Sequence, residues 1–404
     1  MNNNVNIPRT TAVPRDRILD VPDSPVADHA QAKALFSEFH ARSEKLYNGN
    51  GSWGHGCADP NVFPHIDTPC SRPMIRQTAW RVRGYLAAGT VLNDPIFRAR
   101  AYAGCEHLVR EQRPDGYFPY YLDDSGWPIT DSDGIMYVTG IAVDALLDGY
   151  EAFHNPYFLQ AAFRGCEWAM RYPHVSNTNY NSFCVLALAR MAVILAAVPE
   201  ELRPLKSFVW AWHESFRNMI KPDNEFVEYF ISRAVYFTKE GVFPDQQPNG
   251  GWPGHNSWVW YHGIILLGHA RLLCALTLLP CKHALLDLIQ QPLKESTVAA
   301  INYLILNLTS NGDLYKNHES TEPGSPAWPF LAFCALPPQD VKNGKAIWRM
   351  FKLLSAAVVR HCAREKFDAF DLEKTKLPVD VLAGNMMAVG HVMKHLDGKD
   401  IPPA

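Results

Sequence analysis

The sequence predicts an all-α protein, an (α/α)6 toroid in which six helical hairpins close into a barrel. Three observations lead to this fold. Apolar residues recur with helical spacing along most of the 404 residues, small-residue turns return at a nearly constant interval, and two segments are apolar on nearly every side. We expect one domain over residues 28–397, preceded by an extended or disordered arm (1–27) and followed by a short tail (398–404).

The helices are predicted from apolar periodicity, and no segment shows convincing strand alternation. Eleven segments have this periodicity: residues 30–47, 76–92, 95–112, 137–153, 156–172, 182–198, 206–220, 257–279, 293–308, 344–363 and 380–396. Segments 182–198 and 257–279 are apolar nearly all round, which is typical of helices buried on every side. His269 and Arg271 within the second favour an inner-ring helix over a membrane span.

The turns give the number of hairpins. The motifs NGSW, DGYF, NGGW and NGDL carry Gly51, Gly116, Gly250 and Gly312 at their second positions, and these glycines are 65, 134 and 62 residues apart. A further turn at Ser176 falls within the long interval, so one hairpin spans about 60–67 residues and six fill the chain. Because the loops that enter the inner helices of a toroid open on one face, we expect these turns to surround a central pocket.

Composition restricts the classes of function. With 47% apolar residues the chain can bury a large core, and its formal charge of −3 without a lysine or arginine block argues against nucleic acid binding. We therefore expect a small-molecule substrate and leave a homo-oligomer open. The N-terminus lacks the apolar stretch of a secretory signal, and the nine cysteines form no CxxC pair, so a cytoplasmic protein with reduced thiols is expected.

No cofactor or metal is expected. HExxH, paired CxxC and compact histidine–carboxylate spacings are absent from the sequence, which argues against a tightly bound zinc ion. A P-loop and a GxGxxG turn after a strand are also absent, which argues against a nucleotide cofactor.

The first group of candidate site residues lies in an acidic, aromatic segment before and within the helix at 137–153. Asp131 and Asp133 stand among aromatic residues that include Tyr137. A carboxyl group partly desolvated by rings has a raised pKa and can act as a general acid. Asp133 is the stronger candidate for acid or base, and the alternative role for either aspartate is to cap the following helix.

The second group lies at the entrance of the helix at 182–198. Asn177, Asn179 and Asn181 alternate there, and capping the helix accounts for one asparagine but hardly for three. Their amides are candidates to bind a ligand oxygen. Tyr180 is a candidate for substrate contact and proton transfer, and Cys184, one turn later, for a nucleophile or acid; a buried tyrosine and an inert core thiol are the alternatives.

The third group lies in the stretch QQPNGGWPGHNSWVWYHG (246–263), whose glycines and prolines are typical of a loop and whose tryptophans indicate a pocket mouth. Histidine is the usual proton carrier near neutral pH. The candidates are His255 and Tyr261 for catalysis, and Trp252, Trp258 and His262, with Trp53 of the NGSW turn, for substrate contact. Packing is the alternative role for each of these residues.

Two resemblances to known families follow from these motifs. The turns at Gln112–Phe118 and Gln246–Trp252 have the QxxxGxW/F spacing found in squalene-type terpene cyclase toroids. Over residues 80–195, segments 86–104, 131–146 and 179–189 resemble the linalool dehydratase-isomerase family, whose members are (α/α)6 barrels. That resemblance implies acid/base chemistry on a terpenoid, although Gly140 stands where the family has a histidine, and only Cys184 matches its cysteine pair.

Three functions fit the sequence. The first is a cofactor-independent acid/base lyase, isomerase or cyclase for a terpenoid or similar apolar molecule, favoured by the apolar inner helices. The second is a carbohydrate-active (α/α)6 enzyme, a glycoside hydrolase or polysaccharide lyase, favoured by tryptophans on which sugars stack and by the set of Asn177, Asn179, His255 and Tyr261. The third is a binding protein without catalysis.

Overall fold

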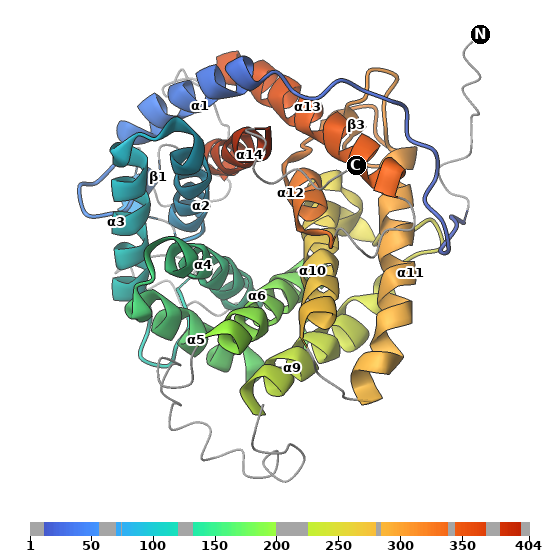
Figure 1. Ribbon diagram of the computed structural model, residues 1–404, viewed down its shortest axis with the longest axis horizontal. Coiled ribbons are helices and arrows are strands. Elements are labelled where there is room, and N and C mark those ends of the chain that lie inside the picture. Colours follow the sequence, from blue (N-terminus) through green and yellow to red (C-terminus); the bar gives the residue numbers. More distant parts are fainter. Residues whose placement is uncertain are drawn as a thin grey trace.

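The computed structural model describes residues 12–55, 70–73, 75–119, 132–198, 225–279, 284–337, 344–368 and 380–396. Within these ranges, twelve α-helices form two concentric rings (Figure 1). The inner ring consists of α2 (Ile75–Leu92), α4 (Ser132–Phe153), α6 (Thr178–Ala197), α10 (Val259–Leu278), α12 (Ala327–Ala335) and α14 (Asp380–Leu396). The outer ring consists of α1 (His29–Glu44), α3 (Pro95–Glu111), α5 (Pro156–Met170), α9 (Glu225–Gly241), α11 (Ala284–Leu306) and α13 (Gly344–Asp368). The predicted (α/α)6 toroid is confirmed.

The inner ring is closed, because each inner helix packs against the next and α14 packs against α2. The outer helices cover this ring from outside, and one continuous apolar core fills the space between the two rings. Both α6 and α10 are long and apolar enough to cross a membrane by length and composition alone. Most of each lies buried inside the fold, 78% and 72% of its most apolar stretch, as expected of inner-ring helices.

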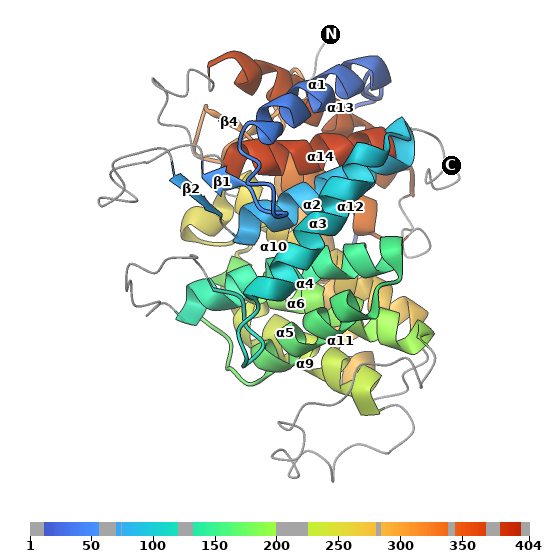
Figure 2. The same ribbon diagram turned by 90° about the vertical axis from the view of Figure 1, so that its left-hand side faces the viewer.

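Short strands and 3-10 turns lie at one end of the barrel. Strands β1 (Gly54–His55) and β2 (Cys70–Pro73) form one antiparallel pair, and β3 (Leu314–Tyr315) and β4 (Pro323–Gly324) form another. Figure 2 shows β1, β2 and β4 on the same side of the molecule. The 3-10 turns η3 (Phe243–Asp245) and η4 (Gly254–Ser257) precede α10. The hairpin loops that enter inner helices therefore gather at one end.

The recurring turns are built on glycines that side chains could not replace. Gly51, Gly116, Gly250 and Gly312 all have positive φ angles, between 75° and 104°. A Cβ added at Gly51, Gly116 or Gly250 would lie 1.9–2.4 Å from a backbone oxygen of the next outer helix. The two-residue spacing then places Trp53, Phe118, Trp252 and Leu314 in the core, each at most 1% exposed. The repeat seen in the sequence is thus a packing device.

The glutamines of the QxxxGxW/F motif have a structural role as well. The Gln112 side-chain amide donates to Gly116 O and to Ala161 O of α5, both at 2.8 Å. Gln246 repeats this arrangement two hairpins later, donating to Gly250 O at 3.1 Å and to Ser296 O of α11 at 3.0 Å. The motif therefore fastens each turn to the neighbouring outer helix.

Two helices differ from the sequence prediction. The helices α9 and α12 were not among the eleven predicted segments, and the predicted helix at 206–220 lies outside the described residues. The nine-residue α12 contains Pro329 and is buried along almost its whole length, so its sequence has no polar face to give a period. α9 is rich in aromatic and β-branched residues, which have only moderate helix propensity.

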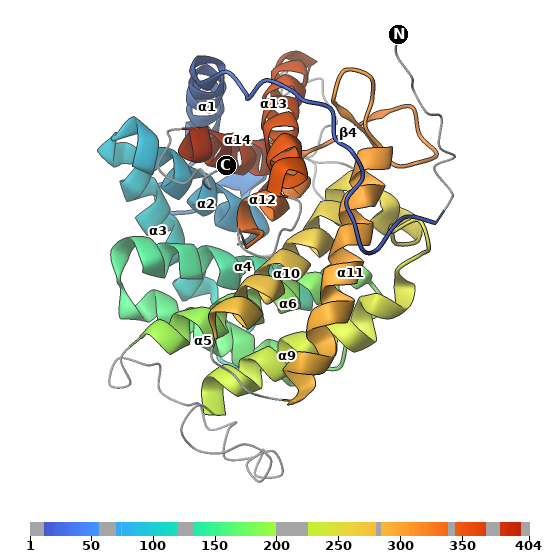
Figure 3. The same ribbon diagram turned by 45° about the vertical axis from the view of Figure 1, so that its right-hand side comes forward.

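The described part of the N-terminal arm is an extended strap. Residues 12–27 run beside α11 and on to α1 (Figure 3). Asn302 of α11, fully buried, holds the strap through both ends of its amide: Oδ1 accepts from Leu19 N at 2.8 Å, and Nδ2 donates to Pro14 O and Arg17 O at 2.8 and 3.0 Å. The strap thus links the last hairpins of the barrel to the first.

Candidate functional site

Two loops from different hairpins meet where α6 and α10 begin. We call the residues there the mouth cluster: Asn177, Asn179, His255, Asn256, Trp258 and Tyr261. Asn177 is the N-cap position of α6 but makes no side-chain capping bond, so its amide is available for other contacts. His255 and Asn256 lie on η4, and Trp258 and Tyr261 lie at the start of α10. The sequence predicted five of these six residues as site residues.

His255 is at the centre of the cluster. Its Nε2 lies 3.3 Å from the Asn177 amide nitrogen and 3.1 Å from that of Asn179, so the neutral imidazole accepts at Nε2 and carries its proton on Nδ1. The Tyr261 ring packs edge-on against the imidazole, with 4.9 Å between centroids. Partial burial lowers the pKa of His255, so the ring is unprotonated near pH 7 and can accept a proton.

Asn179 is buried and has more acceptors around its amide nitrogen than it has hydrogens. Besides His255, Nδ2 lies 2.8 Å from Asn177 Oδ1 and 2.7 Å from Asn256 Oδ1. Its own Oδ1 is buried and has no hydrogen-bond partner. A buried amide oxygen without a partner costs free energy unless a donor reaches it, and ligand hydroxyl groups are such donors. Asn179 is therefore a candidate ligand-binding residue.

Aromatic rings surround the cluster. Trp258 is 36% exposed and lies 5.9 Å from the Tyr261 ring, and the Lys316 ammonium of the loop after β3 sits 4.4 Å above the indole. At the entrance of α6, Tyr180 stacks on Tyr137 of α4 with 5.0 Å between ring centroids. The mouth thus combines accessible ring faces, amides, a histidine and one ammonium group.

Deeper in the inner ring, three tryptophans pack against one another. Trp260 of α10 lies 6.2 Å from Trp80 of α2 and 6.1 Å from Trp328 of α12, and its ring reaches α14, where a Cβ at Gly384 would lie 2.8 Å from it. The indole N–H groups of Trp80 and Trp328 are buried and have no hydrogen-bond partner. These rings fill the barrel at the level where α10 begins.

Four predicted site residues lie in the packed wall, and burial corrects the expectation that they reach substrate. Trp53 and Trp252 follow the glycines of their turns and are fully buried, and Trp252 donates its N–H to Val242 O at 2.9 Å. His262 points outward between α10 and α11, where its Nε2 bonds Ala300 O at 2.9 Å. Cys184 is fully buried, and burial raises the pKa of its thiol to about 12, which disfavours the nucleophilic thiolate.

The acidic candidates are less well defined. Asp131 lies outside the described residues, and Asp133 is the second residue of α4, with its side chain outside the described part. Both remain predictions. At Gly140, where the linalool enzymes have a histidine, an added Cβ would lie 2.8 Å from Phe183 O, so α4 and α6 are too close for any side chain. A histidine at this position would therefore not fit between the two helices.

Sequence reasoning missed two residues of the site. Asn256 follows His255 directly, and only its contact with Asn179, 77 positions away, reveals its role. Lys316 lies in a short hairpin without periodicity and reaches the mouth through the bond from Val259 N to Lys316 O. Among the described residues, no group of three or more histidine, cysteine or acidic side chains could hold a metal ion.

Comparison with known proteins gives the fold a context. No protein-family model and no curated protein sequence matches the chain. Among solved structures, it resembles an unsaturated glucuronyl hydrolase from Streptococcus agalactiae (TM-score 0.57, 9% identity, 95% of this chain and 97% of that one). It also resembles a sugar epimerase from a ruminal bacterium (0.54, 11%, 92% and 100%) and a cellobiose 2-epimerase from Bacillus thermoamylovorans (0.51, 12%, 90% and 99%). At these identities the similarity establishes the (α/α)6 fold.

Proposed function

We propose that this protein is a carbohydrate-active enzyme that removes a proton from a carbon atom of its sugar substrate, as epimerases and lyases do. The observation that carries this proposal is the mouth cluster, in which a neutral histidine lies between two amides and a tyrosine. The similar solved structures are carbohydrate enzymes, which favours a sugar over the terpenoid that the apolar inner helices first suggested.

His255 supplies the base. Its pKa lies below the ordinary histidine value because of partial burial, so at neutral pH the imidazole is free of its second proton. Asn177 and Asn179 hold the Nε2 side of the ring, and a substrate C–H that displaces these amides would meet the lone pair. We propose Tyr261, whose ring packs edge-on to the imidazole, as the acid that returns a proton to the substrate.

Recognition of a sugar follows from the neighbours of the base. The partly exposed indole of Trp258 and the ring of Tyr261 suit the apolar faces of a pyranose, and the unpartnered Asn179 Oδ1 suits a hydroxyl donor. Retaining or inverting hydrolysis needs a pair of carboxyl groups, whereas the mouth cluster consists of amides, a histidine and aromatic rings. Proton abstraction therefore uses these residues more directly than hydrolysis does.

The test is hydrogen exchange during turnover. The protein is incubated in D₂O with neutral disaccharides, with uronate-containing oligosaccharides and, as a competing class, with linear terpenoid alcohols, and products are followed by NMR. We expect deuterium at a sugar carbon, with or without an epimer or an unsaturated product, and loss of exchange in His255→Ala. Turnover of the terpenoid alone would favour the terpenoid lyase, isomerase or cyclase expected first from the sequence. Hydrolysis of a sugar without deuterium exchange would exclude proton abstraction.

A further inference from the structure

The loop before α10 and the first turns of α10 are fixed to one face of the outer helix α11, which packs beside α10 (Figure 3). Ala299 O would lie 2.0 Å from a Cβ at Gly250, and Ala300 O lies 2.9 Å from His262 Nε2. Tyr303 follows these two alanines by four and three positions, so all three residues share one face of α11. Tyr303 is the residue of this face that reaches the mouth cluster.

Tyr303 is fully buried, and its hydroxyl donates to Ser257 O, the last carbonyl of η4, at 2.7 Å. Burial raises the pKa of this hydroxyl to about 12, so it keeps its proton and can donate. The ring stacks on His262 with 4.6 Å between centroids, and a Cβ at Gly251 would lie 2.6 Å from it. His318 Nδ1 lies 3.3 Å from the same oxygen. The hydroxyl is therefore held in place by packing around the ring.

The carbonyl that Tyr303 holds belongs to the same short turn as the proposed base. η4 spans only Gly254–Ser257, and His255 is its second residue. Ser257 Oγ donates to Gly254 O at 2.8 Å, and Trp258 N donates to His255 O at 3.0 Å. These bonds join the four residues, so a movement of Ser257 O also moves the His255 backbone.

Few other contacts fix η4. Residues 253–255 are exposed, and a 3-10 turn has poorer hydrogen-bond geometry than an α-helix. The amides that contact the imidazole, at 3.3 and 3.1 Å, come from α6 and do not move with η4. The position of the imidazole relative to these amides therefore depends on the bond to Ser257 O. An error of 1 Å in the position of a reacting group can lower a rate by about 10²-fold.

We propose that Tyr303 is a positioning residue for His255: its hydroxyl, through Ser257 O, sets where the imidazole lies relative to the α6 amides. Tyr303 touches neither the imidazole nor the aromatic rings of the mouth cluster in any contact described above, so it acts through the backbone of η4. The kinetic consequence rests on the function proposed above, whereas the placement of the imidazole is measurable without a substrate.

The experiment compares Tyr303→Phe with Tyr85→Phe in the full chain. Both substitutions remove one hydroxyl from a fully buried ring, and Tyr85 of α2 bonds Glu44 of α1, so it is the matched control. Histidine side chains are labelled with ¹³C at Cε1 and observed by NMR, and the signal missing from His255→Ala assigns His255. We expect this signal to shift or broaden in Tyr303→Phe and to stay unchanged in Tyr85→Phe. An unchanged His255 signal in Tyr303→Phe would overturn the proposal.

Steady-state kinetics give the second measurement. In Tyr303→Phe we expect kcat to fall about tenfold while KM changes less than about twofold, because the base moves but the α6 amides do not. Tyr85→Phe should keep both values. A lower unfolding midpoint in Tyr303→Phe with wild-type kcat would make Tyr303 a purely structural residue and reject the proposal.

The two measurements also separate this proposal from the proposed function. A shifted His255 signal in a protein that exchanges no sugar proton would support the positioning role of Tyr303 and reject the proposed function. Exchange of a sugar proton that depends on His255 but is equally fast in Tyr303→Phe would support the function and reject the positioning role.

Discussion

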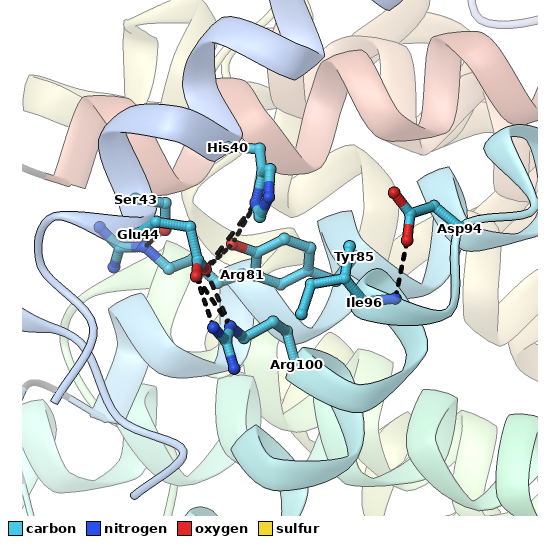
Figure 4. Close-up of polar contacts among 8 residues, drawn as sticks. All are labelled: His40, Ser43, Glu44, Arg81, Tyr85, Asp94, Ile96 and Arg100. Carbon is cyan, nitrogen blue, oxygen red and sulfur yellow. Dashed lines mark hydrogen bonds and ion pairs between the residues drawn. The ribbon is translucent and has the colours of Figure 1, made fainter. Parts of the chain in front are cut away.

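Two polar clusters, one at the mouth and one between α1, α2 and α3, each contain a histidine and a tyrosine. They differ in whether all of their buried polar atoms have hydrogen-bond partners. In the second, which we call the hairpin cluster, Arg100 of α3 donates through Nε to both Glu44 oxygens of α1, at 2.9 and 3.1 Å (Figure 4). Tyr85 of α2 reaches Glu44 Oε1 at 3.4 Å and His40 Nδ1 at 3.1 Å. Each of the four side chains bonds another member.

The mouth cluster also contains a histidine and a tyrosine, yet Asn179 Oδ1 has no partner and Trp258 is partly exposed. Natural proteins satisfy buried polar groups unless the group serves another purpose. The comparison therefore separates polar residues that hold helices together from polar residues that are free to meet a ligand. It also predicts that substitutions in the two clusters will affect different measured quantities.

The largest expected effect is that of His255→Ala on turnover. Removing a positioned base lowers kcat/KM by about 10²–10⁴-fold. Because the His255 side chain is only partly buried, we expect little change in the unfolding midpoint. The control is His174→Ala. His174 is an exposed histidine in the loop before α6 that contacts the Tyr236 hydroxyl, and its loss should leave wild-type kinetics. Equal activity of the two variants would show that the mouth cluster is structural.

Asn179→Ala should come next. Loss of an amide that binds the developing charge or a substrate hydroxyl lowers kcat/KM by about 10²-fold or more. Asn179 Oδ1 already lacks a hydrogen-bond partner, so the substitution removes fewer hydrogen bonds than usual. The free energy of unfolding should therefore fall by less than for a typical buried asparagine. Steady-state kinetics and urea unfolding on the same variant separate the two quantities. A large loss of stability with intact kinetics would place Asn179 among the structural residues.

The buried His262 should make the free energy of unfolding depend on pH. Burial lowers its pKa to about 4, below the ordinary value of 6.5, so the unfolded chain takes up the proton first as pH falls. The stability due to neutral His262 is fully present above pH 6.5 and is lost between there and about 4, on the order of 3 kcal/mol. Urea unfolding of His262→Gln should therefore depend less on pH over that range. An unchanged pH dependence would contradict this.

Tyr85→Phe should have a smaller effect, and only on stability. It removes one buried hydroxyl from the hairpin cluster while the ring stays stacked on Phe97, so the free energy of unfolding should fall by about 1 kcal/mol. Since the hydroxyl lies between outer and inner helices, kcat and KM should not change. A change in kcat would show that the hairpin cluster is coupled to catalysis.

The smallest predicted effect concerns the pH profile. Because partial burial lowers the pKa of His255, the acid limb of kcat/KM should lie below 6.5, the ordinary histidine value. Activity measured from pH 4.5 to 8 gives the position of this limb. A limb above 6.5 would mean that another group is the base.

The sequence by itself determined most of the helices and the repeat of the barrel, because these depend on local properties. Helical periodicity involves neighbours three and four residues apart, and the positive φ angles of Gly51, Gly116 and Gly250 are needed within each turn. The sequence also brought together His255, Asn177, Asn179 and Tyr261 as one set, since all lie at entrances to inner helices.

Only the tertiary structure decided which residues of that set are accessible. Trp252 and Trp258 are six positions apart, and so similar locally that the sequence assigned them one role, yet the first is fully buried and the second 36% exposed. The difference arises because the Trp252 ring packs against His262 and His269 of α10 and its N–H bonds Val242 O. The pairing of Arg83 with Asp148, 65 residues away, likewise depends on the packing of α2 against α4, because local sequence cannot place these helices side by side.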